Sequence, residues 1–329
     1  MNPEMREIAR ILGAAQSVAV LSHVRPEGDA IGSSLGAVLT LHALGKEAVG
    51  FNADPVPAAL AFLPGADALV RTTRIPQPFD CYLVVDASDP DRLGGLLDGV
   101  VPGRPILNID HHPTNNHFGS VSWIDPAAAA AGELLYLLCR GMGVPLSREA
   151  AINFYVAIFT DTGSFRYANT TPRALRIAAE LIEAGVEPGN VAELLYEQRD
   201  VGELRLLGLL LSRIQISPDG MTAWIEVTDE TLREVGVTAD TLEGAINYPA
   251  SIRGVRVALL FRDIIGDGTR VSLRSRGAIN VAAVAQTFGG GGHRNAAGCT
   301  VAGDLSTVRE RVLQEVYRVT AGEDRGGRR

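Results

Sequence analysis

Residues 106–112 read Ile-Leu-Asn-Ile-Asp-His-His, a short apolar run that ends in an aspartate and two histidines. Two other apolar runs of the first half end in a similar way. Ser17–Leu21 is followed closely by His23, and Tyr82–Val85 is followed directly by Asp86. Continuous apolar runs of this length are typical of strands that are buried on both faces of a parallel sheet. We therefore expect three strands of one sheet to lead into chemically active side chains.

Segments with helical patterns alternate with these runs, as they do in βαβ units. A fourth strand is expected at Ala48–Phe51, and helices at Ala30–Leu44, Pro126–Arg140, Arg148–Phe159 and Pro172–Ala184. The first half is therefore predicted to be α/β, with a doubly wound parallel sheet. Gly32 and Gly36 in the first of these helices are explained equally well by close packing on a strand and by an anion site.

The pattern changes in the second half, where we expect a smaller α/β domain with a mixed sheet. Its predicted strands are Met221–Val227, Val255–Phe261 and Arg270–Arg274, and its helices are Val281–Phe288 and Leu305–Val319. A long helix is expected between the halves, from Glu193 to Ile214. The predicted boundaries are a first domain over residues 1–195, a helical linker over 196–213, a second domain over 214–320 and a disordered tail over 321–329.

Composition limits the classes of function. The 329 residues carry a net charge of −8, which argues against a protein that binds long duplex DNA through many phosphates. No run of eighteen apolar residues predicts a membrane helix, and the N-terminus lacks the apolar segment of a signal peptide. The cysteines Cys81, Cys139 and Cys299 lie far apart. Such spacing fits a reducing cytoplasm and a protein without a disulfide framework.

Side chains at the carboxyl ends of parallel strands meet in one crevice of a doubly wound sheet. Aspartates that converge there repel one another unless cations lie between them. A set of carboxylates with a minority of imidazoles suits Mn²⁺ or Mg²⁺ better than Zn²⁺, and enough candidates exist for two ions. A single aspartate after a strand is more often a helix cap. However, four of the six histidines fall in these segments and in the glycine run near residue 290, which favours a metal site over a set of helix caps.

The segment Asp110-His111-His112 and its companions resemble the motifs of the RecJ-like DHH phosphoesterase family. The run from Gly289 to Gly298, Gly-Gly-Gly-Gly-His-Arg-Asn-Ala-Ala-Gly, resembles the hallmark of the DHH-associated domain. The resemblance extends from about Ser17 to about Val301. In length and motif order the chain is most similar to the branch that contains oligoribonucleases for very short RNA (nanoRNases) and phosphatases of 3′-phosphoadenosine 5′-phosphate (pAp).

The resemblance implies a role for each motif residue of the first half. His23 and Glu27 would bind one metal ion, while Asp29, His111 and Asp161 would bind the second. Asp86 would bridge the two ions, and His112 would act near the scissile phosphate, so that Asp86 and His112 are the catalytic candidates. Glu27 departs from the family, which usually has aspartate at this position. The extra methylene moves the carboxylate by about one C–C bond length, and we expect altered metal affinity.

The implied activity is hydrolysis of short oligoribonucleotides and pAp, by in-line attack of hydroxide on phosphorus at two divalent ions. Mn²⁺ is the expected ion, with Mg²⁺ and Co²⁺ as alternatives, and a homodimer is one assembly that the family suggests. Substrate phosphate would be bound by residues of the second domain: Arg253, Arg276, Gly290, Gly291, Gly292 and His293. The glycine amides could contribute to an anion site.

Other functions stay open. Relatives that cleave cyclic or linear dinucleotides suggest a phosphodiesterase of the cyclic di-AMP type. The glycine-rich run argues against a pyrophosphatase with DHH motifs, and the length argues against a processive exonuclease. A nucleotide sensor without catalytic activity is the alternative from another class. It is suggested by Glu27, which stands where the family usually has aspartate.

Overall fold

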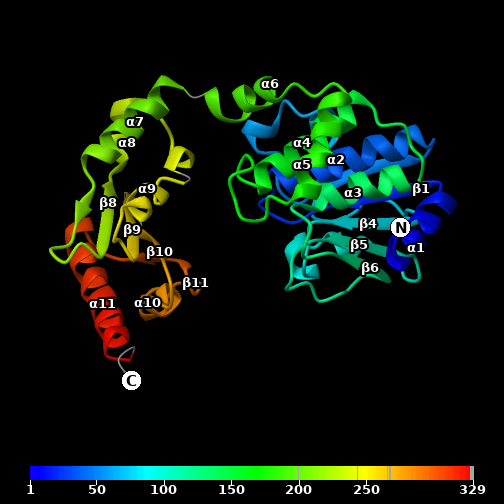
Figure 1. Cartoon of the computed structure of the whole chain (residues 1–329). Coiled ribbons are helices and arrows are strands. Elements are labelled where there is room, and N and C mark those ends of the chain that lie inside the picture. Colours follow the sequence, from blue (N-terminus) through cyan, green and yellow to red (C-terminus); the bar gives the residue numbers. More distant parts are fainter. Residues whose placement is uncertain (199, 243, 265, 267, 327–329) are drawn as a thin grey trace. The chain divides into compact units, whose positions relative to one another are not determined.

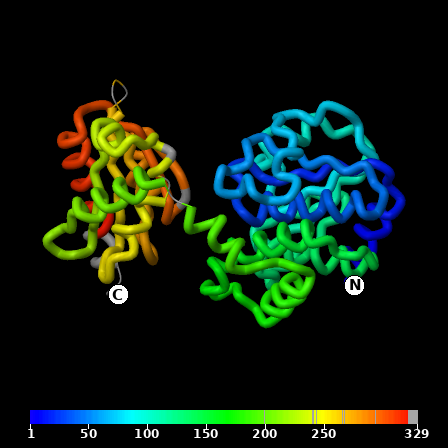
Figure 2. Tube along the Cα trace, turned by 90° about the horizontal axis from the view of Figure 1, so that it is seen from above, coloured from blue at the N-terminus to red at the C-terminus, as the bar shows by residue number. Residues whose placement is uncertain are grey.

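The computed structural model describes residues 1–198, 200–242, 244–264, 266 and 268–326. The chain divides into two compact units, Met1–Gln198 and Arg199–Arg329. Each unit is one continuous stretch of sequence, as the colours of the ribbon and of the chain trace show (Figure 1, Figure 2). Within these described ranges, no helix combines the length and the apolar character that crossing a membrane requires.

The first unit is built on a parallel sheet of six described strands in the order β3-β2-β1-β4-β5-β6. In this order the chain winds first to one side of β1 and then to the other, which makes the sheet doubly wound. The predicted α/β class is therefore confirmed. The edge strands β3 and β6 escaped prediction because neither carries a continuous apolar run: β3 is Val-Arg, and β6 is Val-Ser-Trp-Ile. The strand bounds are β1 (Ser17–Leu21), β2 (Glu47–Asn52), β3 (Val70–Arg71), β4 (Cys81–Val85), β5 (Ile106–Asp110) and β6 (Val121–Ile124).

Helices α2 to α5 lie together over one face of this sheet (Figure 1). The opposite face is covered by the short turns η3 (Pro90–Leu93) and η4 (Leu96–Gly99) and by neighbouring loops. The remaining bounds in this unit are α1 (Pro3–Ala14), α2 (Gly28–Ala43), η1 (Ala58–Leu60), η2 (Ala66–Ala68), α3 (Ala131–Gly141), α4 (Arg148–Asp161), α5 (Pro172–Glu183), α6 (Pro188–Ala192) and η5 (Glu193–Glu197), a π-helical turn.

Alternation along the central strands produces two cores. In β1, Val18 and Val20 belong to the core under the helices, whereas Ala19 and Leu21 belong to the core on the opposite face. All four side chains are fully buried. Burial on both faces is the physical reason for the continuous apolar runs, because neither face of the strand meets water.

The second unit contains a mixed sheet of six described strands in the order β11-β12-β10-β9-β8-β7, in which only β8 and β9 pair in parallel. Helices α10 and α11 cover one face, and α7, α8 and α9 cover the other. The bounds are α7 (Val201–Ser212), β7 (Gln215–Ile216), β8 (Thr222–Val227), α8 (Asp229–Val235), η6 (Ala239–Leu242), α9 (Asn247–Ser251), β9 (Val257–Ile264), β10 (Gly268–Ser275), α10 (Val281–Thr287), β11 (Gly291–His293), β12 (Ala296–Val301) and α11 (Leu305–Gly326).

Helix α3 begins at Ala131, five residues later than the predicted start at Pro126. The side chain of Asp125 accepts the amide of Ala127, and its carbonyl accepts the amide of Ala128. An aspartate that bonds its own following backbone competes with helix formation. Residues 126–130 therefore form a turn, and the alanine run alone gave a wrong helix start.

The continuous helix predicted from Glu193 to Ile214 is also wrong. The π-helical turn η5 ends before Gln198, which has non-helical angles (φ −103°, ψ 66°), and α7 starts anew after Asp200. At the other end of the second unit, α11 continues past the predicted end at Val319 to Gly326. Helix propagation adds one hydrogen bond per residue, so a formed helix extends easily. Of the tail predicted to be disordered, residues 327–329 lie outside the described residues.

Close packing of α2 on α4 gives a test of the fold. A methyl group at Gly32 would collide with the carbonyl oxygen of Asn153 in α4, whereas a methyl group at Gly13 in α1 would meet no atom within 4 Å. Gly32→Ala should lower the free energy of unfolding by roughly 1–3 kcal/mol through overpacking. Gly13→Ala, the matched control, should raise it by up to about 1 kcal/mol through helix propensity. Urea titration of both variants measures this, and equal stabilities would contradict the packing of α2 on α4.

Candidate metal centre

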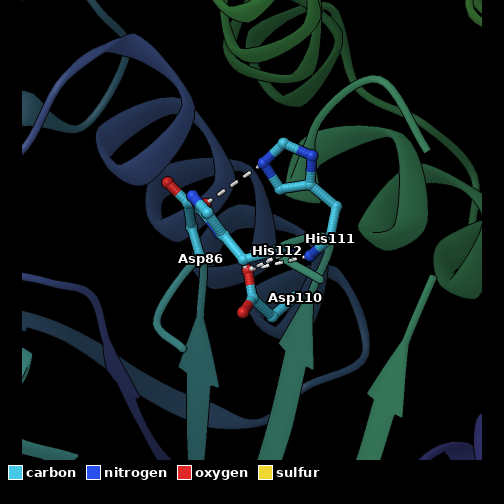
Figure 3. Close-up of side chains that lie close together, drawn as sticks. All are labelled: Asp86, Asp110, His111 and His112. Atoms are coloured by element: carbon cyan, nitrogen blue, oxygen red, sulfur yellow. Dashed lines mark hydrogen bonds and ion pairs between the residues drawn. The ribbon is translucent and has the colours of Figure 1, made fainter. Parts of the chain in front are cut away.

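The predicted site residues of the first unit meet at the carboxyl end of its sheet. Each lies where a strand ends or where a helix begins or ends, so regular structure fixes its backbone. The four segments that contribute are His23, Glu27 and Asp29 between β1 and the first turn of α2; Asp86 after β4; Asp110, His111 and His112 at the end of β5; and Asp161 at the end of α4. Figure 3 shows Asp86 and the Asp-His-His segment reaching toward one another from neighbouring strands.

One group of ligand atoms comes from His23, Glu27 and Asp86, and these atoms lie within 4.8 Å of one another. The Nε2 atom of His23 is 2.8 Å from Oε1 of Glu27 and 3.4 Å from Oδ2 of Asp86. The other ring nitrogen, Nδ1, lies 2.8 Å from the carbonyl oxygen of Val24. If Nδ1 donates to that carbonyl, Nε2 has a free lone pair, which is the tautomer that a cation requires. Glu27 thus reaches the group despite its longer side chain.

A second group of ligand atoms comes from Asp29, His111 and Asp161. The Nε2 atom of His111 is 3.7 Å from Oδ2 of Asp29 and 3.6 Å from Oδ2 of Asp161. It is also 3.6 Å from Oδ1 of Asp86. Asp86 therefore presents one carboxylate oxygen to His23 and the other to His111, so it lies between the two groups.

The Oδ1 atom of Asp86 has no hydrogen-bond partner in the described part of the chain, although the residue is only 1% exposed. Its backbone has φ 54°, a left-handed conformation that costs about 1–2 kcal/mol for a residue with a side chain. A buried carboxylate oxygen without a partner is unfavourable. Carboxylates and imidazoles together are a donor set for Mn²⁺ or Mg²⁺. The residues of the two groups therefore fit two divalent cations with Asp86 between them.

Without metal ions, the negative charge of these carboxylates is compensated by bound protons. Burial, with the charge of Asp29, raises the pKa of Asp86 well above its usual value. The same two causes raise the pKa of Asp161 to about 6. Burial lowers the pKa of His23, but hydrogen bonds with Asp86 and Glu27 outweigh it and raise this pKa to about 10. Without cations, the cluster therefore holds protons that a bound metal ion would displace.

Asp110 is the buried partner of His112. Its Oδ1 lies 2.7 Å from Nδ1 of His112, and its Oδ2 accepts a 2.6 Å hydrogen bond from the amide of Asn115. The Asn115 amide also donates to the side chain of Asn108 and to the carbonyl of Ala87. Because both oxygens of Asp110 are occupied, this carboxylate orients His112. The hydrogen bond with Asp110 raises the pKa of His112 to about 9, so the ring is a cation at neutral pH.

The N-terminus of α3 binds Asp29 directly. The backbone amides of Ala131 and Gly132 donate to the Asp29 carboxylate at 2.6 and 3.0 Å, and Ser33 donates to it at 2.7 Å. A helix N-terminus favours negative charge, which explains how a carboxylate that is 1% exposed is held there. These three donors fix the orientation of the Asp29 carboxylate, one oxygen of which lies 3.7 Å from Nε2 of His111.

The turn before α3 is held by an ion pair within the protein. The fully buried Glu133 accepts the amide of Ala129 and pairs with Arg173 of α5, which also binds Asp125 at 2.9 Å. Asn169 donates to the carbonyls of Ala129 and of Asp161, so it connects this turn with the end of α4. These contacts fix the turn that carries the donors for Asp29. Sequence analysis missed them because the partners are far apart in the chain.

The segment after Asp161 has an unusual backbone. Gly163, Ser164 and Phe165 have φ of 56°, 61° and 62°, three consecutive residues in the left-handed region. The amides of Gly163 and Ser164 bond back to the last turn of α4, and the buried hydroxyl of Thr162 accepts the amide of Phe165. Strained backbone of this kind persists where the surroundings over-determine it, commonly at functional sites. Here it makes the chain turn sharply right after the Asp161 carboxylate.

The predicted substrate-binding residues lie in the second unit and are described within it. Arg253 and Arg276 are exposed, and the backbone of Arg276 bonds to the carbonyl of Arg256. The glycine run is not an open loop. The amides of Gly289 and Gly290 donate to carbonyls of α10, and Gly291–His293 forms β11, which pairs with β12. At Gly290 and Gly292 a Cβ would collide with carbonyls of β12, so close strand packing requires glycine at these positions.

Comparison with known proteins agrees with this architecture. The DHH family N-terminal domain matches residues 17–158, and the DHHA1 domain matches residues 224–321. A protein of Thermus thermophilus named bifunctional oligoribonuclease and PAP phosphatase NrnA is 37% identical, over 95% of this chain and 93% of its own. A protein of the same name from Bacillus subtilis is 29% identical, over 90% and 92%.

Among solved structures, an exopolyphosphatase-related protein from Bacteroides fragilis shares the fold of the whole chain. The TM-score is 0.85 at 26% identity, and the match covers 96% of each chain. Because both domain matches occur in order, and a relative shares 37% of residues over nearly the full length, the chain belongs to the DHH family of phosphoesterases with a C-terminal DHHA1 domain.

Proposed function

We propose that this protein hydrolyses short oligoribonucleotides and pAp at the metal centre of its first unit. The observation that carries the proposal is Asp86, a buried carboxylate with one oxygen toward His23 and the other toward His111. Such an arrangement serves two cations and the phosphate between them. The names of the Thermus thermophilus and Bacillus subtilis relatives support the choice of substrates.

The ligand assignment follows the two groups of side chains. His23, Glu27 and Asp86 would hold one cation, and Asp86, Asp29, His111 and Asp161 the other. When bound, two divalent cations, of which we propose Mn²⁺, neutralise charge on the phosphate and lower the pKa of bound water.

His112 would donate a proton or a hydrogen bond at the reacting phosphate. Asp110 stabilises the protonated form of His112 and raises its pKa, and the ring is about one third exposed. Asp110 binds its Nδ1 and is itself held by the amide of Asn115, so Nε2 of His112 is the atom left for substrate. General acids of this kind contribute about 10²–10⁴-fold to a rate.

The second unit would bind the remainder of the substrate through Arg253, Arg276 and the segment Gly290–His293. Both arginines are exposed, as anion-binding side chains must be. We propose that short chains are preferred, that long duplex DNA is no substrate and that the protein acts in the cytoplasm, which suits its three free cysteines. A homodimer stays a prediction from the family.

Two alternatives share the same centre. A phosphodiesterase of cyclic or linear dinucleotides would use the same cations. A sensor that binds nucleotides without cleaving them is less consistent with Asp86, because a binding protein gains nothing from a strained, partnerless carboxylate between two ligand groups.

Product release with Mn²⁺, from pAp, a short RNA, a long RNA, a cyclic dinucleotide and pyrophosphate, tests the proposal. We expect release from pAp and the short RNA, and loss of both activities with chelator. Asp86→Asn should reduce them by roughly a thousandfold or more, a loss typical of a group on which the whole centre depends. The exposed Asp67, changed to Asn in the same way, is the matched control and should behave as wild type.

Thermal unfolding in chelator shows whether Asp86→Asn acts through the fold. The variant should be at least as stable as wild type in chelator, because it removes a buried acid that is disfavoured by burial and by the charge of Asp29. Tight nucleotide binding without turnover of any substrate would assign the protein to the sensor class, and release from the cyclic dinucleotide alone would favour the alternative enzyme.

The pKa shifts predict how metal binding depends on pH. With a pKa of about 6, Asp161 keeps its proton to a higher pH than a free aspartate, and a ligand must lose that proton. His23, with a pKa of about 10, must also release one at neutral pH. The affinity for Mn²⁺ should therefore fall at least about tenfold from pH 7 to pH 5, with proton release on binding. Calorimetry in buffers of different ionisation enthalpy measures both, and a flat pH profile without proton release would contradict the assignment.

A further inference from the structure

Arg92 places a positive charge at the rim of this negatively charged centre. It lies in the turn η3 after β4, six residues beyond Asp86, and none of the sequence motifs includes it. Its backbone is fixed because the Val24 amide donates to the Arg92 carbonyl at 2.7 Å. The next residue, Leu93, is fully buried. The side chain of Arg92 is exposed, so an ordered backbone presents a solvent-accessible guanidinium.

The guanidinium lies close to His23, but its hydrogen bond with the ring is incompatible with a metal ion bound to that histidine. Its Nη2 is 3.2 Å from Nδ1 of His23, but the same Nδ1 is 2.8 Å from the carbonyl oxygen of Val24. A ring nitrogen that donates to a carbonyl cannot also accept from an arginine. With a cation at Nε2, Nδ1 carries the proton and donates to Val24. Arg92 then has a guanidinium free of this contact.

The charge of Arg92 acts on both sides of the centre. Burial raises the pKa of Glu27, and the hydrogen bond with His23 lowers it, with a further lowering by Arg92. The hydrogen bond with Asp110 raises the pKa of His112, and Arg92 opposes this rise. These effects agree with the 3.2 Å distance between the guanidinium and the His23 ring, which places Arg92 at the edge of the centre. Among the described residues, it nevertheless forms no ion pair with a carboxylate.

A guanidinium that contacts His23 of an acidic centre but pairs with no carboxylate among the described residues is best explained by an anion that is not part of the protein. The planar fork of arginine matches the oxygens of a phosphate and can bind two of them at once. We infer that Arg92 binds a non-bridging oxygen of the scissile phosphate, on the His23 side of the centre, as a substrate-contacting residue of the first unit. This inference rests on the proposed function and deepens it, because it assigns a contact with the reacting group to the catalytic unit itself.

If Arg92 contacts the phosphate, its removal should weaken catalysis and phosphate binding but leave the binding of Mn²⁺ unchanged. Arg92→Gln should lower kcat/KM for a short RNA by roughly a hundredfold or more, the scale of one donor to a reacting oxyanion. Inorganic phosphate, used as a competitive inhibitor, should bind at least about tenfold more weakly. The affinity for Mn²⁺ should stay within about threefold of wild type, because Arg92 is no ligand. Arg92→Lys should be intermediate, since it keeps the charge and loses the fork.

The matched control is Arg74→Gln, an exposed arginine in the same unit with no part in the centre, which should keep wild-type values. Two results would overturn the inference. If Arg92→Gln keeps kcat/KM and phosphate inhibition within about threefold of wild type, the guanidinium does not touch the phosphate. If Mn²⁺ affinity falls together with activity, Arg92 supports His23 instead. A wild-type protein that hydrolyses nothing would instead refute the proposed function, so the two failures are distinguishable.

Discussion

Repulsion between carboxylates at one edge of the first sheet is the constraint on which the rest of the structure depends. Five carboxylates from four segments of the chain meet around His23, His111 and His112: Glu27, Asp29, Asp86, Asp110 and Asp161. Buried like charges disfavour one another, so the fold is tolerable only with protons or cations between them. In the metal-free protein, burial together with this repulsion raises the pKa values of Asp86 and Asp161. The same repulsion becomes affinity once divalent cations bind.

The surrounding scaffold reduces this repulsion at fixed points. Asp29 is bound by the N-terminus of α3, and Asp110 pairs with His112 and accepts a hydrogen bond from the amide of Asn115. Among the carboxylates of this centre, all of them in the described part of the chain, Asp86 is the one with a buried oxygen that accepts no hydrogen bond. The protein thus supplies hydrogen-bond donors to Asp29 and Asp110, whereas one oxygen of Asp86 is left without a donor. Contacts behind the ligands, such as the pair of Glu133 with Arg173, hold this arrangement in place.

The sequence predicted what depends on local pattern. Strands buried on both faces produce apolar runs, so β1, β4 and β5 were recognised together with the polar residues that follow them. Contacts between distant residues have no such pattern: Arg173 meets Glu133 across forty positions, and Asn169 joins the ends of two helices. The start of α3 failed because the Asp125 turn overrode the helix propensity of alanine, and the long helix after Glu193 failed because Gln198 leaves helical geometry. The glycine run was recognised, but its reason, close packing of β11 on β12, required the structure.

The most direct test of two cations around Asp86 is anomalous diffraction from a crystal of the protein grown with Mn²⁺. The account predicts two peaks in the first unit. One should lie against His23, Glu27 and Asp86, and the other against Asp29, Asp86, His111 and Asp161, with Asp86 contacting both. A single peak, or a peak coordinated by Asp110 in place of Asp86, would contradict it.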